Sequence, residues 1–297
     1  MKKRSFIVFI NPISGTKSKG FLAALIKTEL AKNNFIFEIL PTEKSGKYEF
    51  LKQKIENENI TDIIICGGDG SVNQIASHTL GTVVNIGIIP MGSGNGLAFC
   101  AGIPKNPKKA LDIIIAGNAS FIDAFWVNKQ FSCHLIGLGF DAQVAHSFAN
   151  QPKRGPTTYI KEVVKNYFKA KPFSFQINID GHTINTEAFF VCIANSNQFG
   201  NKIVIAPKAS LSDGLLDIVI VNKTNKFNVL LKIIKQLFTG KVVGIDNKKR
   251  IVQYYHTKKL SVSNLSMAPL HIDGEPEKTK KFFEINIIEK AFLLLQP

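Results

Sequence analysis

The sequence predicts an α/β domain followed by an antiparallel β-sandwich domain with helical inserts. From residue 5 to residue 117, short apolar runs alternate with segments whose apolar residues recur at helical spacing. After residue 121, short segments with alternating apolar and polar residues dominate. The chain has 297 residues, which suggests two domains. We therefore expect domains over residues 1–124 and 125–297, and a return of the last strand to the first domain is left open.

The first domain is expected to hold an open parallel sheet. Strands are predicted over residues 5–11, 35–40, 62–66 and 85–89. Helices are predicted from apolar stripes within residues 21–30, 48–55, 72–80 and 110–117. Because strands and helices alternate, the loops after the strands should gather at the carboxyl edge of the sheet.

The second domain is expected to be a sandwich or barrel of short strands. Strands are predicted over residues 131–138, 173–180, 188–193, 216–221, 260–264 and 283–288. Two helical inserts interrupt them, near Tyr159–Phe168 and Phe227–Phe238. The phenylalanines of this half are read first as core residues, and second as the lining of an apolar slot.

Charge and cysteine content indicate where the protein works. The formal net charge is +15, which makes nucleic acid and an anionic membrane surface the candidate partners. No nucleic-acid-binding motif accompanies the lysines, so we expect membrane contact and no nucleic acid. The four cysteines form no CxxC pair, and the apolar run Phe6–Ile10 is too short for a signal peptide. We expect free thiols in a cytoplasmic protein that lies peripherally at the inner membrane surface.

The most informative motif is the glycine-rich turn Gly67–Gly70, which stands between a predicted buried strand and a predicted helix. Glycines let backbone N–H groups approach phosphate oxygens, and the helix N-terminus adds partial positive charge. Asp69 within this turn cannot help to bind phosphate by its own negative charge, so it needs a metal ion or a proton as a partner. That requirement indicates phosphoryl transfer. Three further loops should reach the same sheet edge: residues 11–15, Thr42 and residues 90–96.

Two better-known phosphate motifs are excluded by their own spacing. Gly15 and Gly20 have Walker spacing, but Phe21 follows where lysine is needed. Residues 92–96 begin like a dinucleotide fingerprint, but no third glycine completes it. Any one loop could be a plain tight turn; four loops at one edge favour a site.

In the second half, Asp273-Gly274-Glu275 carries two carboxylates that could hold a metal or deprotonate a hydroxyl. On spacing alone an ordinary hairpin turn is the better reading, because Asp-Gly is a common hairpin signal. Ser212-Asp213-Gly214 has the same ambiguity.

Taken together, these segments resemble the diacylglycerol kinase catalytic family, its soluble bacterial lipid kinases and its sphingosine kinase relatives. The matching segments are Asn11-Pro12 with Gly15, Thr42, Gly67–Asn73, Pro90–Asn95, Gly137–Ala142, Ala206–Gly214 and Asp273–Glu275. They span nearly the whole chain in the family's order. The Gly-Asp-Gly turn is shared with NAD kinases, whereas the full series is specific.

The resemblance implies an NAD-kinase-like α/β domain and a β-sandwich domain that phosphorylate a lipid hydroxyl with ATP and Mg²⁺. It assigns Asp69 to Mg²⁺ and phosphate, Glu275 to accepting the hydroxyl proton, and Asp273 to supporting Glu275. It assigns the nucleotide to Asn11, Thr42, Gly67, Gly68, Asp69, Gly70, Ser71, Val72, Asn73, Gln74 and Ser93. A second metal site, structural in role, would use Asp213 with oxygens of Ser210 and Leu215. Arg154 resembles a basic residue near the phosphates.

One departure leaves the acceptor lipid open. Many bacterial members continue the second glycine loop with Asn-Asp-Phe-Ala, whereas this chain has Asn95-Gly96-Leu97-Ala98. Diacylglycerol, giving phosphatidic acid in phospholipid biosynthesis, is the first expectation, and a sphingoid base or another long-chain alcohol is the alternative. An NAD kinase and a non-catalytic binding module remain as other classes, and a homodimer remains open.

Overall fold

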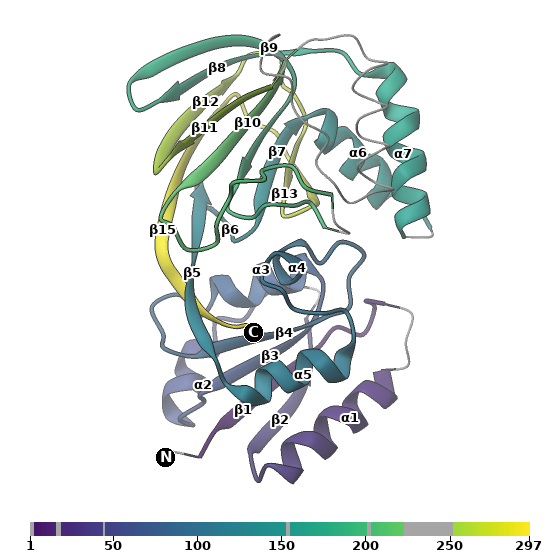
Figure 1. The fold of residues 1–297 in the computed structure, drawn as a ribbon, viewed down its shortest axis with the longest axis vertical. Coiled ribbons are helices and arrows are strands. Elements are labelled where there is room, and N and C mark those ends of the chain that lie inside the picture. The colour runs from purple at the N-terminus through teal and green to yellow at the C-terminus, as the bar shows by residue number, and fades with distance from the viewer. Residues whose placement is uncertain (1–2, 16–18, 44, 153–154, 201–202, 223–251) are drawn as a thin grey trace. The chain divides into compact units, whose positions relative to one another are not determined.

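The computed structural model describes residues 3–15, 19–43, 45–152, 155–200, 203–222 and 252–297. Figure 1 shows the path of the chain and labels its helices and strands. Contacts divide the chain into two compact units, Met1–Asp123 with Glu289–Pro297, and Ala124–Ile288. The first is a parallel α/β unit and the second is rich in antiparallel strands, so the predicted fold class is confirmed.

Unit 1 is built on a parallel sheet with strand order β2-β1-β3-β4. Its strands are β1 (Ser5–Ile10), β2 (Ile36–Pro41), β3 (Asp62–Gly67) and β4 (Asn85–Pro90). The end of β15 (Phe282–Leu295) returns beside β4, where Leu293 and Leu294 pair in parallel with Asn85 and Ile86. β1 and β3 are buried along their whole length, as a parallel sheet covered on both faces requires.

Helices cover both faces of this sheet (Figure 1). They are α1 (Lys19–Lys32), α2 (Leu51–Asn57), α3 (Asp69–Ser77), α4 (Gly96–Cys100) and α5 (Pro107–Ala116). α5 is capped at its start by Asn106, whose side chain accepts a hydrogen bond from Lys109 N, and at its end by Gly117, whose φ is 80°. Both ends follow ordinary capping chemistry, and the predicted end near Gly117 is confirmed.

Two aromatic residues of the predicted stripes lie elsewhere than expected. Phe21 is 67% exposed on α1, because Leu22, Ile26 and Leu30 alone form the buried face of that helix. Tyr48 precedes α2 instead of belonging to it. Its buried ring packs edge-on against Phe9, so it anchors the loop after β2 instead of a helix face.

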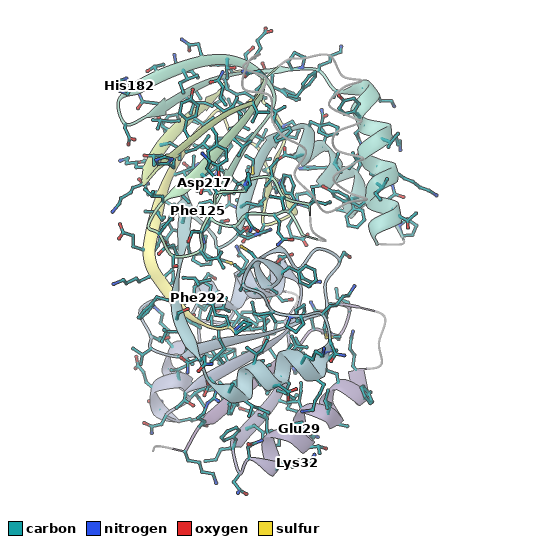
Figure 2. All side chains as sticks on the ribbon, in the orientation of Figure 1. Glu29, Lys32, Phe125, His182, Asp217 and Phe292 are labelled. Carbon is teal, nitrogen blue, oxygen red and sulfur yellow. The ribbon has the colours of Figure 1, made fainter. Side chains whose placement is uncertain are left out.

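Unit 2 is an antiparallel sandwich with an apolar interior. Its strands are the end of β5 (Ala119–Val127), β6 (Gln130–Ser132), β7 (Leu135–Gly139), β8 (Phe173–Ile179), β9 (His182–Ala194), β10 (Leu216–Asn222), β11 (Val252–Thr257), β12 (Lys259–Asn264), β13 (Leu270–Ile272), β14 (Glu275–Glu277) and the start of β15. β9 pairs with β8 along its first half and lies between β7 and β10 along its second. Phe125 lies in the core of this unit and Phe292 in that of unit 1, both labelled in Figure 2.

Two helices pack on one face of the unit 2 sheet, α6 (Phe140–Ala149) and α7 (Pro156–Lys169). α7 is the predicted insert near Tyr159–Phe168, whereas α6 was not predicted. The predicted strand 131–138 is interrupted at Cys133 and His134, and β7 runs directly into α6 at Gly139, whose φ is 110°. The insert predicted near Phe227–Phe238 lies outside the described residues. No helix among the described residues is long and apolar enough to cross a membrane.

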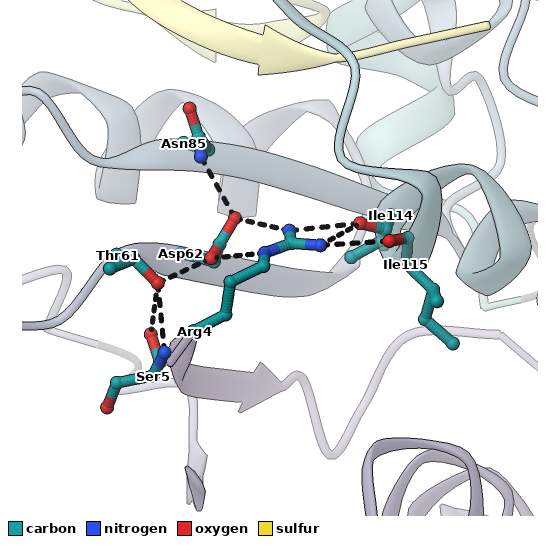
Figure 3. A network of polar contacts seen from close by, with 7 residues as sticks. All are labelled: Arg4, Ser5, Thr61, Asp62, Asn85, Ile114 and Ile115. Atoms are coloured by element: carbon teal, nitrogen blue, oxygen red, sulfur yellow. Dashed lines mark hydrogen bonds and ion pairs between the residues drawn. The ribbon is translucent and has the colours of Figure 1, made fainter. Parts of the chain in front are cut away.

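A buried ion pair joins the starts of the unit 1 strands (Figure 3). Arg4 donates to both carboxylate oxygens of Asp62, at 2.9 and 2.5 Å, and to the last carbonyls of α5. Asp62 also accepts from Thr61 Oγ1 and, at 3.1 Å, from Asn85 on β4. Its carboxylate is fully buried, so charge neutralisation and these hydrogen bonds offset its desolvation.

We expect Asp62→Ala to lower the free energy of unfolding by about 2–4 kcal/mol, because the half-buried guanidinium of Arg4 loses its partner. Urea denaturation measures this. The matched control, Glu29→Gln, removes the carboxylate that pairs at the surface with Lys32 and Lys108; Glu29 and Lys32 are labelled in Figure 2. This change should have little effect. Equal small effects of both changes would contradict a special role for Asp62.

Candidate functional site

The carboxyl edge of the unit 1 sheet brings the predicted loops together. Asn11 follows β1, and its Nδ2 donates to Ser71 Oγ at 2.9 Å in the first part of α3. Thr42 follows β2, and its backbone N–H donates to Ile10 O at 3.0 Å. The loops after β1, β2 and β3 are therefore joined to one another, as the parallel topology predicts.

The two glycine-rich turns touch backbone to backbone. A Cβ placed on Gly92 would lie 2.6 Å from Gly68 Cα, and one on Gly68 would lie 3.0 Å from Gly92 Cα. Met91 N donates to Gly67 O at 2.8 Å beside this contact. Glycine is required at both positions because no side chain fits between the two turns. The two turns therefore meet through backbone rather than side chains, an arrangement that suits a ligand with many acceptor oxygens.

Asp69 lies at the start of α3, directly after Gly68. Its carboxylate Oδ1 accepts a hydrogen bond from Leu97 N at 3.2 Å, so the first glycine turn is tied to the start of α4. The residue is half-buried. A carboxylate beside a helix N-terminus and a glycine turn can ligate a cation that also contacts phosphate oxygens. Asp69 therefore fits Mg²⁺ by donor type.

Asn95 fixes the shape of the second turn. It adopts a left-handed conformation with a φ of 53°, and its side chain accepts from Gly92 N at 2.7 Å and donates to Gly92 O at 2.8 Å. Both functional groups of this buried amide are thus used inside the turn. Ser93 lies half-buried within that turn.

The remaining predicted nucleotide residues divide by accessibility. Val72 is buried in the core, so its backbone alone could face a ligand, whereas Gly70 and Asn73 are half-buried and Gln74 is exposed. Lys19, at the start of α1, was not among the predicted residues. Its ammonium donates to Ser14 O in the loop after β1 and lies near enough to Cys66 to act on its thiol electrostatically. Burial is the larger influence there and raises the pKa of Cys66.

In unit 2, Asp273 is a buried anchor. Its Oδ1 accepts from Ser132 Oγ at 2.6 Å, Leu135 N at 3.0 Å and His134 N at 3.2 Å, and its Oδ2 accepts from Cys133 N at 3.2 Å. A carboxylate that satisfies three backbone N–H groups holds the β13–β14 turn against the start of β7. These contacts position the turn, whereas the predicted support of Glu275 by Asp273 stays a prediction.

Glu275 begins β14 on a two-residue hairpin. Asp273 and Gly274 have φ values of 49° and 83°, the positive pair that such tight hairpins use. Ile272 pairs with Glu275 across the turn. The carboxylate is exposed while its backbone is fixed by the neighbouring anchor. The hairpin turn is therefore confirmed, and the catalytic role of Glu275 stays a prediction.

The predicted second metal site is an exposed turn. Asp213 Oδ1 accepts from Leu215 N at 3.1 Å, and Ser212 N donates to Ser210 Oγ at 3.4 Å. One carboxylate with hydroxyl and carbonyl oxygens is compatible with a hard cation, although the turn already satisfies part of that set. No group of three or more His, Cys, Asp or Glu side chains placed for a metal occurs in the described part of the chain. Arg154 lies outside the described residues.

We expect Asp273→Ala to lower the free energy of unfolding by about 2–4 kcal/mol, because several buried N–H donors lose their acceptor. Glu275→Gln, two residues away and exposed, should leave it within about 0.5 kcal/mol. Chemical denaturation of both variants measures the difference. Equal stability of Asp273→Ala and wild type would show that the hairpin does not depend on this anchor.

Comparisons with known proteins agree with this arrangement. Residues 5–127 match the diacylglycerol kinase catalytic domain, and residues 134–284 match the YegS C-terminal NAD kinase beta sandwich-like domain. A diacylglycerol kinase of Staphylococcus aureus (strain bovine RF122 / ET3-1) is 30% identical over 283 residues, which cover 93% of this chain and 87% of the relative. The relative of strain JH9 is 29% identical over the same length.

Solved structures agree in fold. A putative diacylglycerol kinase from Bacillus anthracis str. Sterne superposes with a TM-score of 0.83 at 23% identity, covering 100% of this chain and 98% of that chain. A second structure from the same strain gives a TM-score of 0.79 at 22% identity with the same coverage. Kinases of the matched family use ATP. By its length of match and its identity to named relatives, the chain belongs to the diacylglycerol kinase catalytic family of lipid kinases.

Proposed function

We propose that the protein is an ATP-dependent kinase that transfers the γ-phosphoryl group to a lipid hydroxyl. The observation that carries this proposal is the backbone contact between Gly68 and Gly92 beside Asp69, which makes a side-chain-free cradle for phosphate oxygens. The names of the relatives make diacylglycerol the first acceptor to test.

The residues divide the reaction between donor and acceptor. The N–H groups of the Gly67–Gly70 turn and of the start of α3 would bind phosphate oxygens, and Lys19 would supply positive charge. Mg²⁺, held by Asp69 and phosphate oxygens, would neutralise charge on the transferred group. Glu275 would accept the proton of the lipid hydroxyl, while Asp273 keeps the hairpin in place.

Charge supports the place of action. The net charge of +15 would draw the protein to an anionic membrane surface, where its lipid acceptor resides. We therefore propose a cytoplasmic enzyme that meets the inner membrane surface peripherally.

The deciding experiment incubates the protein with labelled ATP and Mg²⁺, and offers diacylglycerol, monoacylglycerol, a sphingoid base and NAD separately. We expect labelled lipid, and we expect Glu275→Gln to lower kcat by about 10²- to 10⁴-fold, the usual worth of a general base. Its ATP affinity should persist. Glu277→Gln, a matched change on the same strand, should keep wild-type turnover.

Other outcomes redirect the assignment. Labelled NAD without labelled lipid would indicate an NAD kinase. ATP binding with no labelled product would indicate a non-catalytic module. Full turnover by Glu275→Gln would remove this residue from the reaction.

A second prediction concerns the phosphate cradle. Gly92→Ala places a methyl group against Gly68 and should weaken ATP binding by at least about tenfold, because the two turns must separate. Isothermal titration calorimetry measures the affinity. The control is Gly155→Ala in unit 2, where an added Cβ meets nothing within 4 Å. Unchanged ATP affinity of Gly92→Ala would show that the contact does not shape the site.

A further inference from the structure

Three loops of unit 2 are joined into one surface by hydrogen bonds. They are residues 264–268 at the end of β12, residues 278–282 between β14 and β15, and residues 171–174 at the start of β8. Asn264 N donates to Lys281 O at 2.8 Å, which joins the first two loops. Leu265 N donates to Ser174 O at 3.1 Å, which joins the first and the third. We call these three loops the loop surface.

A buried amide holds the central turn of the loop surface. Asn264 is 1% exposed, and its Oδ1 accepts from Ala268 N at 2.8 Å. Its Nδ2 donates to Ala268 O and to Thr279 Oγ1, both at 2.9 Å. Thr279 Oγ1 in turn donates to Ala268 O at 2.6 Å. These bonds fix the shape of the turn before any partner binds, so little ordering remains to be done on binding.

This turn holds apolar side chains in solvent. Leu265 is 66% exposed and Met267 is 44% exposed. Met267 has a φ of 51°, a left-handed conformation that is unfavourable for a residue with a side chain. Phe282, in the neighbouring loop, is 53% exposed. Large apolar side chains grouped on a fixed surface indicate a partner that covers them.

Lysines surround these apolar side chains. Four exposed lysines belong to the loop surface: Lys171, Lys278, Lys280 and Lys281. None of the four forms an ion pair with another described residue. The nearest carboxylates along the strands are those of Glu277, which precedes Lys278, and of Glu187, which pairs with Ser174 across β8 and β9. Four lysines against two carboxylates leave the loop surface positive.

An anionic lipid bilayer matches this combination better than another macromolecule does. Lysine is depleted where two proteins meet, because its flexible ammonium is strongly hydrated. Exposed leucine and methionine side chains find no partner on a nucleic-acid backbone. In a bilayer, by contrast, apolar side chains enter the boundary between headgroups and acyl chains while lysines contact lipid phosphates.

The loop surface adjoins the hairpin that carries Glu275. Lys278 follows directly after β14, which begins at Glu275. Because a strand rises by about 3.3 Å per residue, the backbones of Glu275 and Lys278 are about 10 Å apart along the chain. Leu270 pairs with Glu277 at the open end of the same hairpin, on the side of the loop surface. Docking through the loop surface would therefore hold Glu275 close to the lipids.

We propose that the loop surface docks unit 2 on an anionic lipid bilayer. Leu265 and Met267 insert among the headgroups, and the lysines bind lipid phosphates. The proposal rests on the lipid kinase function argued above and names the face through which the enzyme meets its substrate. Its consequence is that an acceptor in an anionic bilayer is phosphorylated faster than the same acceptor in a neutral one.

Cosedimentation with vesicles of equal parts phosphatidylglycerol and phosphatidylcholine measures the docking. We expect wild type to bind these vesicles and to bind vesicles of phosphatidylcholine alone far more weakly. Combining Lys278→Gln, Lys280→Gln and Lys281→Gln should weaken binding about a hundredfold, because each lysine near an anionic surface is worth about fivefold. Combining Leu265→Gln and Met267→Gln should weaken it about tenfold, because two apolar side chains no longer leave water.

Matched controls make the same chemical changes elsewhere in the chain. Combining Lys27→Gln, Lys52→Gln and Lys109→Gln removes three exposed lysines of unit 1, and Val83→Gln removes an apolar side chain that is 84% exposed. Both controls should bind within about threefold of wild type, because charges beyond the Debye length are screened. All variants should unfold at the urea concentration of wild type, because the changed side chains are exposed. Equal losses in the two lysine variants would overturn the proposal in favour of general attraction by net charge.

Fluorescence tests the insertion itself. With the anionic vesicles, the emission of Leu265→Trp should shift to shorter wavelength as the indole leaves water, and that of Val83→Trp should not. An unshifted emission of Leu265→Trp on sedimenting vesicles would overturn the insertion of this turn.

Activity distinguishes failure of this inference from failure of the lipid kinase function. With dihexanoylglycerol in free solution, the loop-surface variants should keep kcat/KM within about twofold of wild type. With long-chain diacylglycerol in the anionic vesicles, they should lose as much kcat/KM as they lose binding. Wild-type vesicle binding by these variants, with diacylglycerol still phosphorylated, would overturn the inference and keep the lipid kinase. The expected binding losses without any labelled lipid would overturn the lipid kinase and support the docking surface.

Discussion

The ion pair between Arg4 and Asp62 is the constraint on which the arrangement of unit 1 depends. It joins the starts of β1 and β3. Asn85 on β4 donates to Asp62, and Arg4 donates to carbonyls in the last turn of α5. A shift of one strand by one residue would turn all its side chains to the other face and would also separate these partners. Because the strands are parallel and of equal length, fixing their starts also fixes where their carboxyl ends meet. The loops at that far edge can then be glycine-rich without losing their relative positions.

In each unit, the carboxylate of an aspartate holds a turn of the candidate site in place through hydrogen bonds from backbone N–H groups. Asp69 accepts a hydrogen bond from Leu97 N and so links the first glycine turn of unit 1 to the helix that follows the second. Asp273 accepts hydrogen bonds from three backbone N–H groups and holds the β13–β14 hairpin of unit 2. Charge-assisted bonds of this kind are stronger than neutral ones and leave little freedom to the backbone. The cost is that such an oxygen is less available to a ligand. The neighbouring Asp273 holds the backbone at Glu275 in place, while the carboxylate of Glu275 stays exposed. Such an arrangement would suit the proposed role, in which Glu275 takes up a proton and releases it.

Sequence patterns revealed the parts of the molecule that repeat simple rules. Buried parallel strands read as apolar runs, and Gly117 ended a helix through a positive φ that glycine tolerates. The glycine turns were recognisable because the backbone contact between Gly68 and Gly92 forbids other residues. By contrast, α6 was missed because β7 enters it at Gly139 with no polar interval, so the apolar run continued through the junction. The anchoring of Asp273 was also hidden, because its partners lie about 140 residues earlier in the chain.

The features that sequence patterns missed, α6 and the contacts of Asp273, lie in unit 2. That unit is the part of the chain to which we assign the acceptor lipid. The proposed phosphate-binding elements are local turns, and such turns can be recognised in a sequence by the spacing of their glycines. By contrast, Gly137, His271 and Asp141 lie far apart in the chain or on different elements, and only tertiary packing brings them to one point. Membership of the family therefore indicates the donor chemistry more firmly than it indicates the acceptor lipid.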